Sequence, residues 1–86
     1  MNKKYFSEKE AAEAASKIGI KWNETDFNLK QFTEGMNIEL EHGAHDSETN
    51  ITNDDPIMTG KIALAHLKEI SDYYDRLEIM EKEAEK

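Results

Sequence analysis

Apolar side chains recur every three or four positions along most of this chain, which is the spacing of helices that bury one face. Residues 7–10, Ser-Glu-Lys-Glu, form a capping box directly after Phe6, and Gly19 is a residue type that commonly ends helices. A helix is therefore predicted between Ser7 and Gly19. Its buried stripe consists of Ala11, Ala15 and Ile18.

A second helix is predicted over about residues 27–43. The connection before it, residues 20–27, carries three large side chains that are expected to fill the core from a loop: Ile20, Trp22 and Phe27. Either Asp26 or Asn28 can cap this helix, and Gly43 can end it. The apolar stripe of the helix consists of Leu29, Phe32, Met36 and Leu40.

Residues 44–55 are mostly polar turn-forming types, which predicts an ordered loop. Such a loop is long for a small domain, and long loops are often functional. Because Ile51-Thr52 has strand character, a two-stranded ribbon within 44–53 is the alternative.

The third helix is expected to be the central one. Asp55-Pro56 provides a cap followed by Pro at the first helical position, and the apolar residues after it cover most of the circumference. Gly60 would let another backbone come close. A fourth helix should start at Ser71-Asp72, where one of the adjacent Tyr73 and Tyr74 is expected in the core and the other at the surface. Its stripe consists of Tyr73, Leu77, Met80 and Ala84.

Length and composition narrow the class of protein. Eighty-six residues make one domain, spanning 1–86, and the predicted elements give an all-α fold: a compact bundle of about four helices with an ordered polar loop between helices two and three. There is no Cys, which excludes disulfides, thiolate metal sites and Cys nucleophiles. No apolar run follows the first residues, so neither a signal peptide nor a membrane span is expected, and the chain is predicted to be cytoplasmic.

The negative charge is concentrated in the middle third of the chain. The net charge is −8, which disfavours direct binding to DNA or RNA, and residues 31–60 contain seven Asp or Glu and no Lys or Arg. Such a segment attracts basic surfaces, so we expect a non-enzymatic protein that binds a basic partner protein, its acids standing in for nucleic-acid phosphates. An acidic loop that only keeps the protein soluble is the alternative. The residues expected to contact the partner are Glu41, Asp46, Glu48, Asp54 and Asp55.

A divalent metal site between helices two and three is the second hypothesis. Glu39 and His42 stand at i and i+3, which places them on one helix face. His66 and Glu69 repeat the spacing in reverse order. The Glu-x-x-His spacing occurs in helical-bundle di-metal proteins, and these side chains bind zinc, iron or manganese. In the simpler alternative, His66 faces the packed side of its helix and only hydrogen-bonds to Glu39 or to a backbone carbonyl.

Three other sequence patterns resemble known binding or catalytic motifs, but their residues do not match the required spacing. No catalytic residue is predicted. Residues 46–57 begin like an EF-hand loop but lack Gly at the sixth position and Glu at the twelfth, which leaves only a nonstandard cation site at Asp54 or Asp55. Residues 59–61 lack the earlier Gly of a P-loop. Residues 45–47, His-Asp-Ser, are adjacent and so cannot form a catalytic relay.

Several stretches of the chain together carry a resemblance to a known family. They are Glu-Leu-Glu-His-Gly at 39–43, Thr-Asn-Ile-Thr and Asp-Asp-Pro within 49–56, Thr-Gly-Lys-Ile-Ala-Leu-Ala-His-Leu at 59–67, and Asp-Tyr-Tyr with Arg-Leu within 72–77. Over about residues 36–80 the chain resembles a family of small proteins of unknown function found in bacteria and their phages, in which a Pro commonly stands at the position of Ser71. The resemblance implies a phage or bacterial cytoplasmic protein and supplies no substrate.

The resemblance also gathers the loop and the ends of two helices into one unit. That grouping fits a loop held down by the helix ends, in which Asp54 or Asp55 caps the third helix. Asn50 or Thr52 would then hydrogen-bond near His42. Such a scaffold competes with a binding site as the explanation of these residues.

Overall fold

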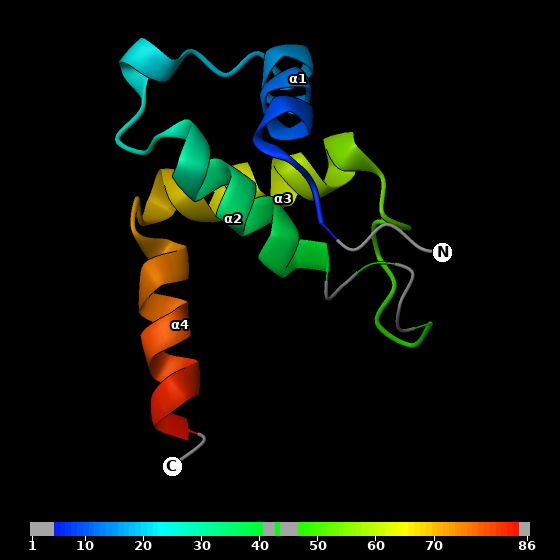
Figure 1. Ribbon diagram of the computed structural model, residues 1–86, viewed down its shortest axis with the longest axis vertical. Helices are drawn as coiled ribbons and strands as arrows, with labels where there is room; N and C mark the ends of the chain where they lie inside the picture. Colours follow the sequence, from blue (N-terminus) through cyan, green and yellow to red (C-terminus); the bar gives the residue numbers. More distant parts are fainter. Residues whose placement is uncertain (1–4, 41–42, 44–46, 85–86) are drawn as a thin grey trace.

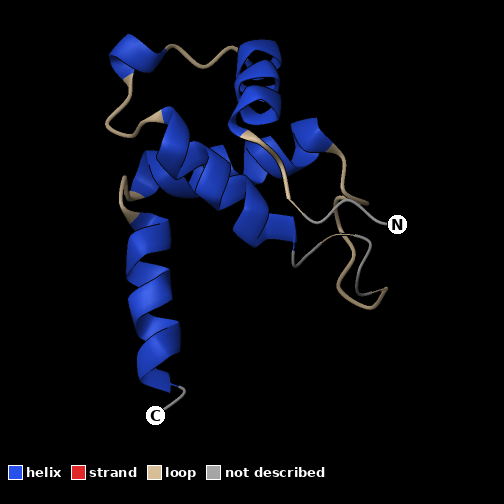
Figure 2. Cartoon of the chain, viewed as in Figure 1, coloured by secondary structure: helices blue, strands red, loops and turns tan. Residues whose placement is uncertain are grey.

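The computed structural model describes residues 5–40, 43 and 47–84, and every regular element in these ranges is helical (Figures 1 and 2). The all-α prediction is therefore confirmed, and residues 47–53 form turns and bends rather than a strand. The elements in chain order are α1 Glu8–Ile18, the short 3-10 helix η1 Trp22–Glu24, α2 Leu29–Glu39, α3 Pro56–Glu69 and α4 Tyr73–Ala84.

Helix α1 begins and ends where its local sequence predicts. The Ser7 hydroxyl accepts from the Glu10 amide (3.1 Å), and the Glu10 carboxylate accepts from the Ser7 amide (2.9 Å), so two of the unpaired amides at the helix start are satisfied. Gly19 ends the helix in the left-handed region with φ of 97°, which a residue with a Cβ adopts only with strain.

Helix α2 starts as predicted but ends earlier. Asn28 caps it in a reciprocal pair with Gln31 (2.9 and 2.8 Å). The helix ends at Glu39 rather than near Gly43, so the prediction of a helix over 27–43 is wrong at that end. The Gly43 amide turns back to the Leu40 carbonyl (2.9 Å), and the Asp54 carboxylate lies where a Cβ of Gly43 would be. The spacing of apolar residues along the chain does not predict this long-range contact.

Helix α3 is central, as predicted, and packs against α1, α2 and α4 (Figure 1). A Cβ added at Gly60 would lie 2.9 Å from Ile18 Cδ1 and 3.2 Å from the Phe32 ring. The missing side chain therefore lets α1 and α2 reach α3. The buried core consists of Phe6, Ala11, Ala14, Ala15, Phe27, Phe32, Met36, Ala63, Leu67 and Tyr74. Trp22 stays at the rim, with its ring edge to face against Phe27 and Phe32 (6.0 and 5.9 Å).

The described part of the loop between α2 and α3 is held by its own polar groups. The Asn50 side chain accepts from the Asn53 amide (2.7 Å), and the buried Thr52 hydroxyl accepts from the Asp54 amide (3.2 Å). Asn53 and Asp54 both have positive φ, a conformation that Asn and Asp tolerate better than most residues. Asp55 then caps α3 by accepting from the Met58 amide (2.8 Å). Over residues 47–55 the ordered polar loop is confirmed.

The face of α4 that is buried differs from the predicted one. Of its residues only Tyr74 is buried, whereas the predicted stripe runs outward to Met80 and Ala84, which are exposed. The first turns of α4 contact α2 and α3, and the rest of the helix projects from the body (Figure 1). No helix in the described ranges combines the length and apolar character needed to cross a bilayer.

We predict that Thr59→Val stabilises the protein by about 1 kcal/mol, because a buried polar group without a partner costs free energy that an apolar group of the same shape does not. Within the described residues, the Thr59 hydroxyl is buried and has no hydrogen-bond partner. Thr33→Val is the matched control, since the Thr33 hydroxyl donates to the Leu29 carbonyl (2.7 Å). Chemical denaturation of both variants is the measurement. Equal shifts of the same sign would contradict the assignment.

Candidate functional site

A buried carboxylate lies where α2 ends. Glu39 is the last residue of the helix and is only 5% exposed, and its Oε2 accepts a hydrogen bond from the Tyr74 hydroxyl (2.7 Å). Burial of a carboxylate is costly unless the group is hydrogen-bonded or paired. This bond therefore ties the end of α2 to the start of α4, 35 positions away in the sequence.

Tyr74 is held in place by packing as well as by this bond. A Cβ added at Gly35 would lie 2.5 Å from Tyr74 Cε2, so the ring lies directly on the backbone of α2. Burial, the hydrogen bond to Glu39 and the negative charge of Glu39 raise the pKa of Tyr74 well above its usual value of about 10. The phenol stays protonated and remains a donor throughout the neutral range.

His66 of α3 completes a polar cluster with Glu39, Tyr73 and Tyr74. Its Nε2 lies 3.6 Å from Glu39 Oε2, which is an ion-pair distance when the imidazole is protonated and is longer than a hydrogen bond. The imidazole stacks on the Tyr73 ring with centroids 4.3 Å apart and planes 5° apart, and Tyr74 meets it edge to face. The His66 side chain is 38% exposed, so the cluster reaches from the core to solvent.

Two of the three predicted metal ligands are thus brought together. Glu39 and His66 are neighbours, as the simpler alternative for His66 also requires, while His42 lies outside the described residues. Among the described residues no group of three or more His, Asp or Glu is placed to hold a metal ion. One tyrosine is predicted in the core and the other as an exposed contact residue of an interface; Tyr74 is buried and Tyr73 is half-buried. Their partnership with Glu39 and His66 depends on how α4 meets α2 and α3, and the adjacent Tyr73-Tyr74 pair was the only signal of it.

The predicted partner-binding acids have different environments. The Asp55 carboxylate caps α3. Glu48 and Asp54 each interact with other groups of the fold, Glu48 being exposed and Asp54 half-buried. Glu41 and Asp46 lie outside the described residues. The structure therefore places three of the five in or beside the polar loop that precedes α3.

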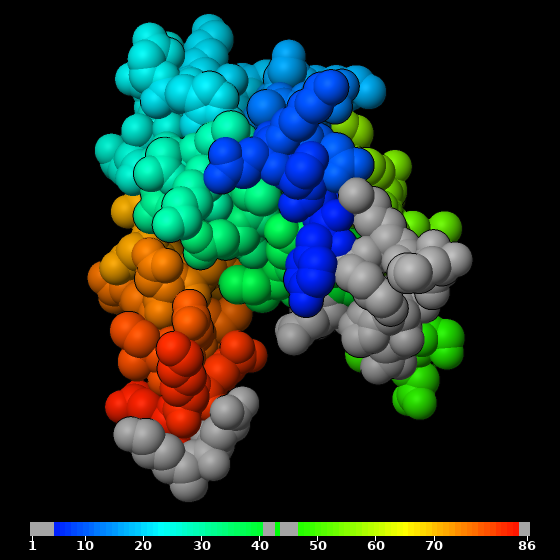
Figure 3. Space-filling view, viewed as in Figure 1, coloured from blue at the N-terminus to red at the C-terminus, as the bar shows by residue number. Residues whose placement is uncertain are grey.

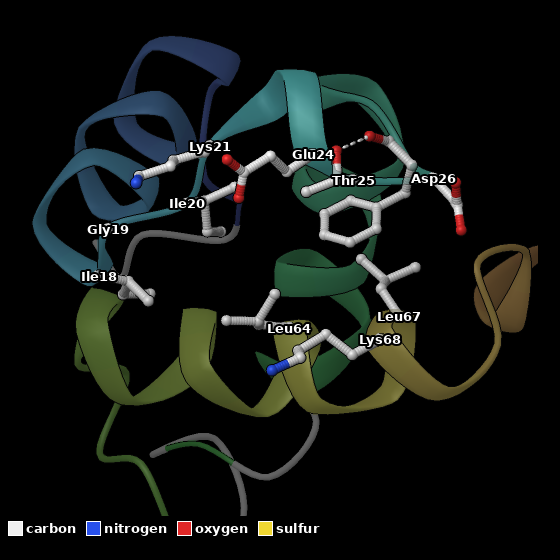
Figure 4. A pocket seen from close by; sticks show the side chains of 11 residues that line it. Ile18, Gly19, Ile20, Lys21, Glu24, Thr25, Asp26, Leu64, Leu67 and Lys68 are labelled. Carbon is white, nitrogen blue, oxygen red and sulfur yellow. Dashed lines mark hydrogen bonds between the residues drawn. The ribbon is translucent and has the colours of Figure 1, made fainter.

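A surface pocket of about 430 Å³, which no sequence pattern indicates, lies between the end of α1, the η1 connection and α3 (Figure 4). Ile20, Phe27 and Leu64 supply apolar lining, and the side chains of Lys21 and Lys68 line its edge (Figure 4). The Thr25 hydroxyl donates to the Phe27 carbonyl (2.7 Å), which leaves it poorly placed to act as a nucleophile. Glu24 and Asp26 also line the pocket, so its lining combines apolar side chains with charges of both signs.

We predict that Tyr74→Phe lowers the free energy of unfolding by about 1–3 kcal/mol, because it leaves a buried carboxylate oxygen without its donor. Tyr73→Phe is the control: its ring stacking on His66 is retained, and a change below about 0.5 kcal/mol is expected.

The same pair of variants gives a pH signature. The folded-state pKa of Tyr74 is raised, so its stabilising effect is fully present below the unfolded-state value of about 10 and is lost as the pH rises above it. Urea denaturation from pH 7 to pH 11 should show the wild type and Tyr74→Phe converging. A constant difference across that range would contradict the role assigned to the phenol.

No curated protein and no solved structure matches the chain. A family model described as a protein of unknown function, DUF5661, matches residues 11–83. That match runs from within α1 to the last turn of α4 and includes all four members of the polar cluster. The chain belongs to the DUF5661 family of proteins of unknown function.

Proposed function

We propose that this chain is a non-enzymatic interaction protein whose acidic middle segment, residues 31–60, binds a basic partner protein. The charge distribution carries the proposal, because this segment holds seven acids and no Lys or Arg in a chain of net charge −8. If the chain comes from a phage, the partner is a host protein that handles nucleic acid, and the carboxylates take the place of phosphates. Steering of a basic surface depends on such a local excess of charge.

Hydrogen bonding within the fold does not remove this charge. Asp55 accepts from a backbone amide of α3, and the Glu39 carboxylate accepts from a phenol. Both donors are uncharged at neutral pH, so the negative charge of the segment persists even though individual oxygens are engaged. The field at the surface follows the summed charge rather than the number of unoccupied lone pairs.

The loop also presents an apolar side chain. Ile51 is 65% exposed within residues 47–55, next to the exposed Thr49 and Asn50. Interfaces commonly combine an apolar contact with a charged rim, since burial of apolar area contributes affinity and charge contributes specificity and association rate. An exposed Ile in an acidic loop fits that combination.

A divalent metal site is the second candidate, and one distance favours it. Glu39 Oε2 and His66 Nε2 lie 3.6 Å apart, close to the separation of about 3.4 Å between two ligands of a tetrahedral metal with bonds of about 2.0–2.1 Å. Glu39 and His66 would be ligands, with His42 as the predicted third. The Tyr74 hydroxyl would hydrogen-bond the ligating carboxylate, as outer partners commonly do.

The interaction proposal is tested by capture of partners from a lysate of the source cells, treated with nuclease, at about 0.05 M and about 0.5 M salt. The immobilised wild type should retain a basic protein at low salt and release it at high salt, because exposed charges are screened. Glu41→Gln/Asp46→Asn/Glu48→Gln should retain several-fold less of it.

The control triple Glu13→Gln/Glu24→Gln/Asp26→Asn makes the same change in net charge at exposed positions outside the segment. It should capture as much partner as the wild type. If retention of the captured protein did not depend on salt, or if both triple variants reduced that retention equally, the middle segment would not be the binding surface.

The metal candidate is tested by elemental analysis of protein purified without a polyhistidine tag. About one equivalent of zinc, iron or manganese per chain is expected, and His66→Ala or His42→Ala should lower it several-fold. His45→Ala is the matched control and should leave the metal content unchanged. Metal far below one equivalent in the wild type would eliminate this candidate.

A further inference from the structure

In the part of the chain that the structure describes, every side chain in the distal half of α4, residues 78–84, is exposed. Tyr73 and Leu77 lie against the core, and beyond them the helix extends past the other helices (Figure 1), so that its end forms a projecting column on the surface (Figure 3). Two large apolar side chains of this half are exposed, Ile79 at 59% and Met80 at 58%. Short helices are marginal in water on their own, so an exposed apolar face on one is informative.

The apolar residues of α4 fall on one line of the helix. At about 100° per residue, Leu77, Met80 and Ala84 lie within an arc of about 60°, and we call these three residues the α4 seam. Their spacing of three and four is that of a helix that packs along another helix. Ile79 lies about 130° away from the centre of the seam, on a different face.

Acidic side chains border the seam on both sides. Glu81 lies about 70° from its centre in one direction and Glu83 about 90° in the other. The two cations of α4 are already paired, Arg76 with Asp72 (2.7 Å) and Lys82 with Glu78 (3.1 Å). Within the described residues Glu81 and Glu83 form no ion pair, so the Glu81 edge of the seam is acidic. The other edge carries Glu83 together with Arg76, which lies about 70° from the centre of the seam and is paired with Asp72.

We propose that the α4 seam docks a basic amphipathic helix of the partner protein, with apolar side chains on Met80 and Lys or Arg side chains against Glu81 and Glu83. The inference rests on the proposed function for the basic character of the partner, and adds an apolar contact outside the acidic middle segment. A second copy of the chain is a poor occupant. An antiparallel pair of copies would bring the two Glu81 edges together, and like charges across an interface oppose association. On the other edge it would gain only exposed pairs between Arg76 and Glu83, which contribute little.

Met80 and Ile79 provide a matched pair of variants for the test. They are neighbours with nearly equal exposure, so Met80→Glu and Ile79→Glu add the same charge to the same helix on different faces. The probe is a fluorescein-labelled two-heptad peptide with Leu at a and d and Lys at e and g. Its binding is followed by fluorescence anisotropy at about 0.05 M and about 0.5 M salt. A scrambled peptide of the same composition is the peptide control.

Met80→Glu should weaken binding of the helical peptide at least about tenfold, although it makes the protein more acidic, because a carboxylate would replace the apolar contact at the centre of the seam. Ile79→Glu should bind as the wild type does or slightly more tightly. Circular dichroism should show both variants folded, since neither side chain is buried. Non-specific attraction to an acidic protein would instead strengthen binding in both variants.

The remaining outcomes distinguish failure of the seam from failure of the proposed function. Equal effects of the two variants, or equal binding of the scrambled peptide, would remove the seam as a docking site while partner capture by the middle segment still stands. A wild-type dimer in sedimentation equilibrium that Met80→Glu dissociates would show that a second copy covers the seam. Failure of the middle-segment triple to reduce partner capture, with peptide binding still sensitive to Met80→Glu, would refute the proposed function and not the seam.

Discussion

The close approach of α1 and α2 to the small residues of α3 is the constraint on which the rest of the structure depends. Gly60 and Ala63 present almost no side chain, so Phe32 can lie fully buried beside the backbone of α3. A domain of 86 residues can bury only a small core, and here most of that core comes from α1, α2 and α3, with Phe6, Phe27 and Tyr74 added from outside these three helices. A larger side chain at Gly60 would separate the helices that define it.

The fourth helix is attached to this core by a different kind of interaction. Tyr74 packs on Gly35 and donates to the buried Glu39, so one side chain supplies both the apolar contact and the partner of a buried charge. A polar contact of this kind is directional, and it fixes where α4 begins without holding its far end. The outer turns of α4 are consequently left to water or to a partner, and the family assignment supplies no activity that would choose between them.

The features on which the proposals depend lie in three different places. The acidic segment and its exposed Ile51 precede α3, the α4 seam lies on a projecting helix, and the polar cluster of Glu39, His66, Tyr73 and Tyr74 lies between α2, α3 and α4. The first two are surfaces suited to binding a macromolecule. The third combines a buried carboxylate with a half-exposed imidazole, which is a reasonable start for a metal site and equally a means of joining three helices.

Features that depend on neighbours a few positions apart could be predicted from residue types alone. The Ser7–Glu10 capping box, the Gly19 end of α1 and the Asp55-Pro56 start of α3 are local interactions, and all were read correctly from residue types at fixed spacing. The meeting of Glu39 and His66 was predicted from the sequence, but the crossing of the helices was needed to show that α2 ends at Glu39 and that Tyr74, rather than Met80 and Ala84, is buried. These outcomes depend on how helices distant in sequence cross, and periodicity identifies an apolar face without specifying what, if anything, covers it.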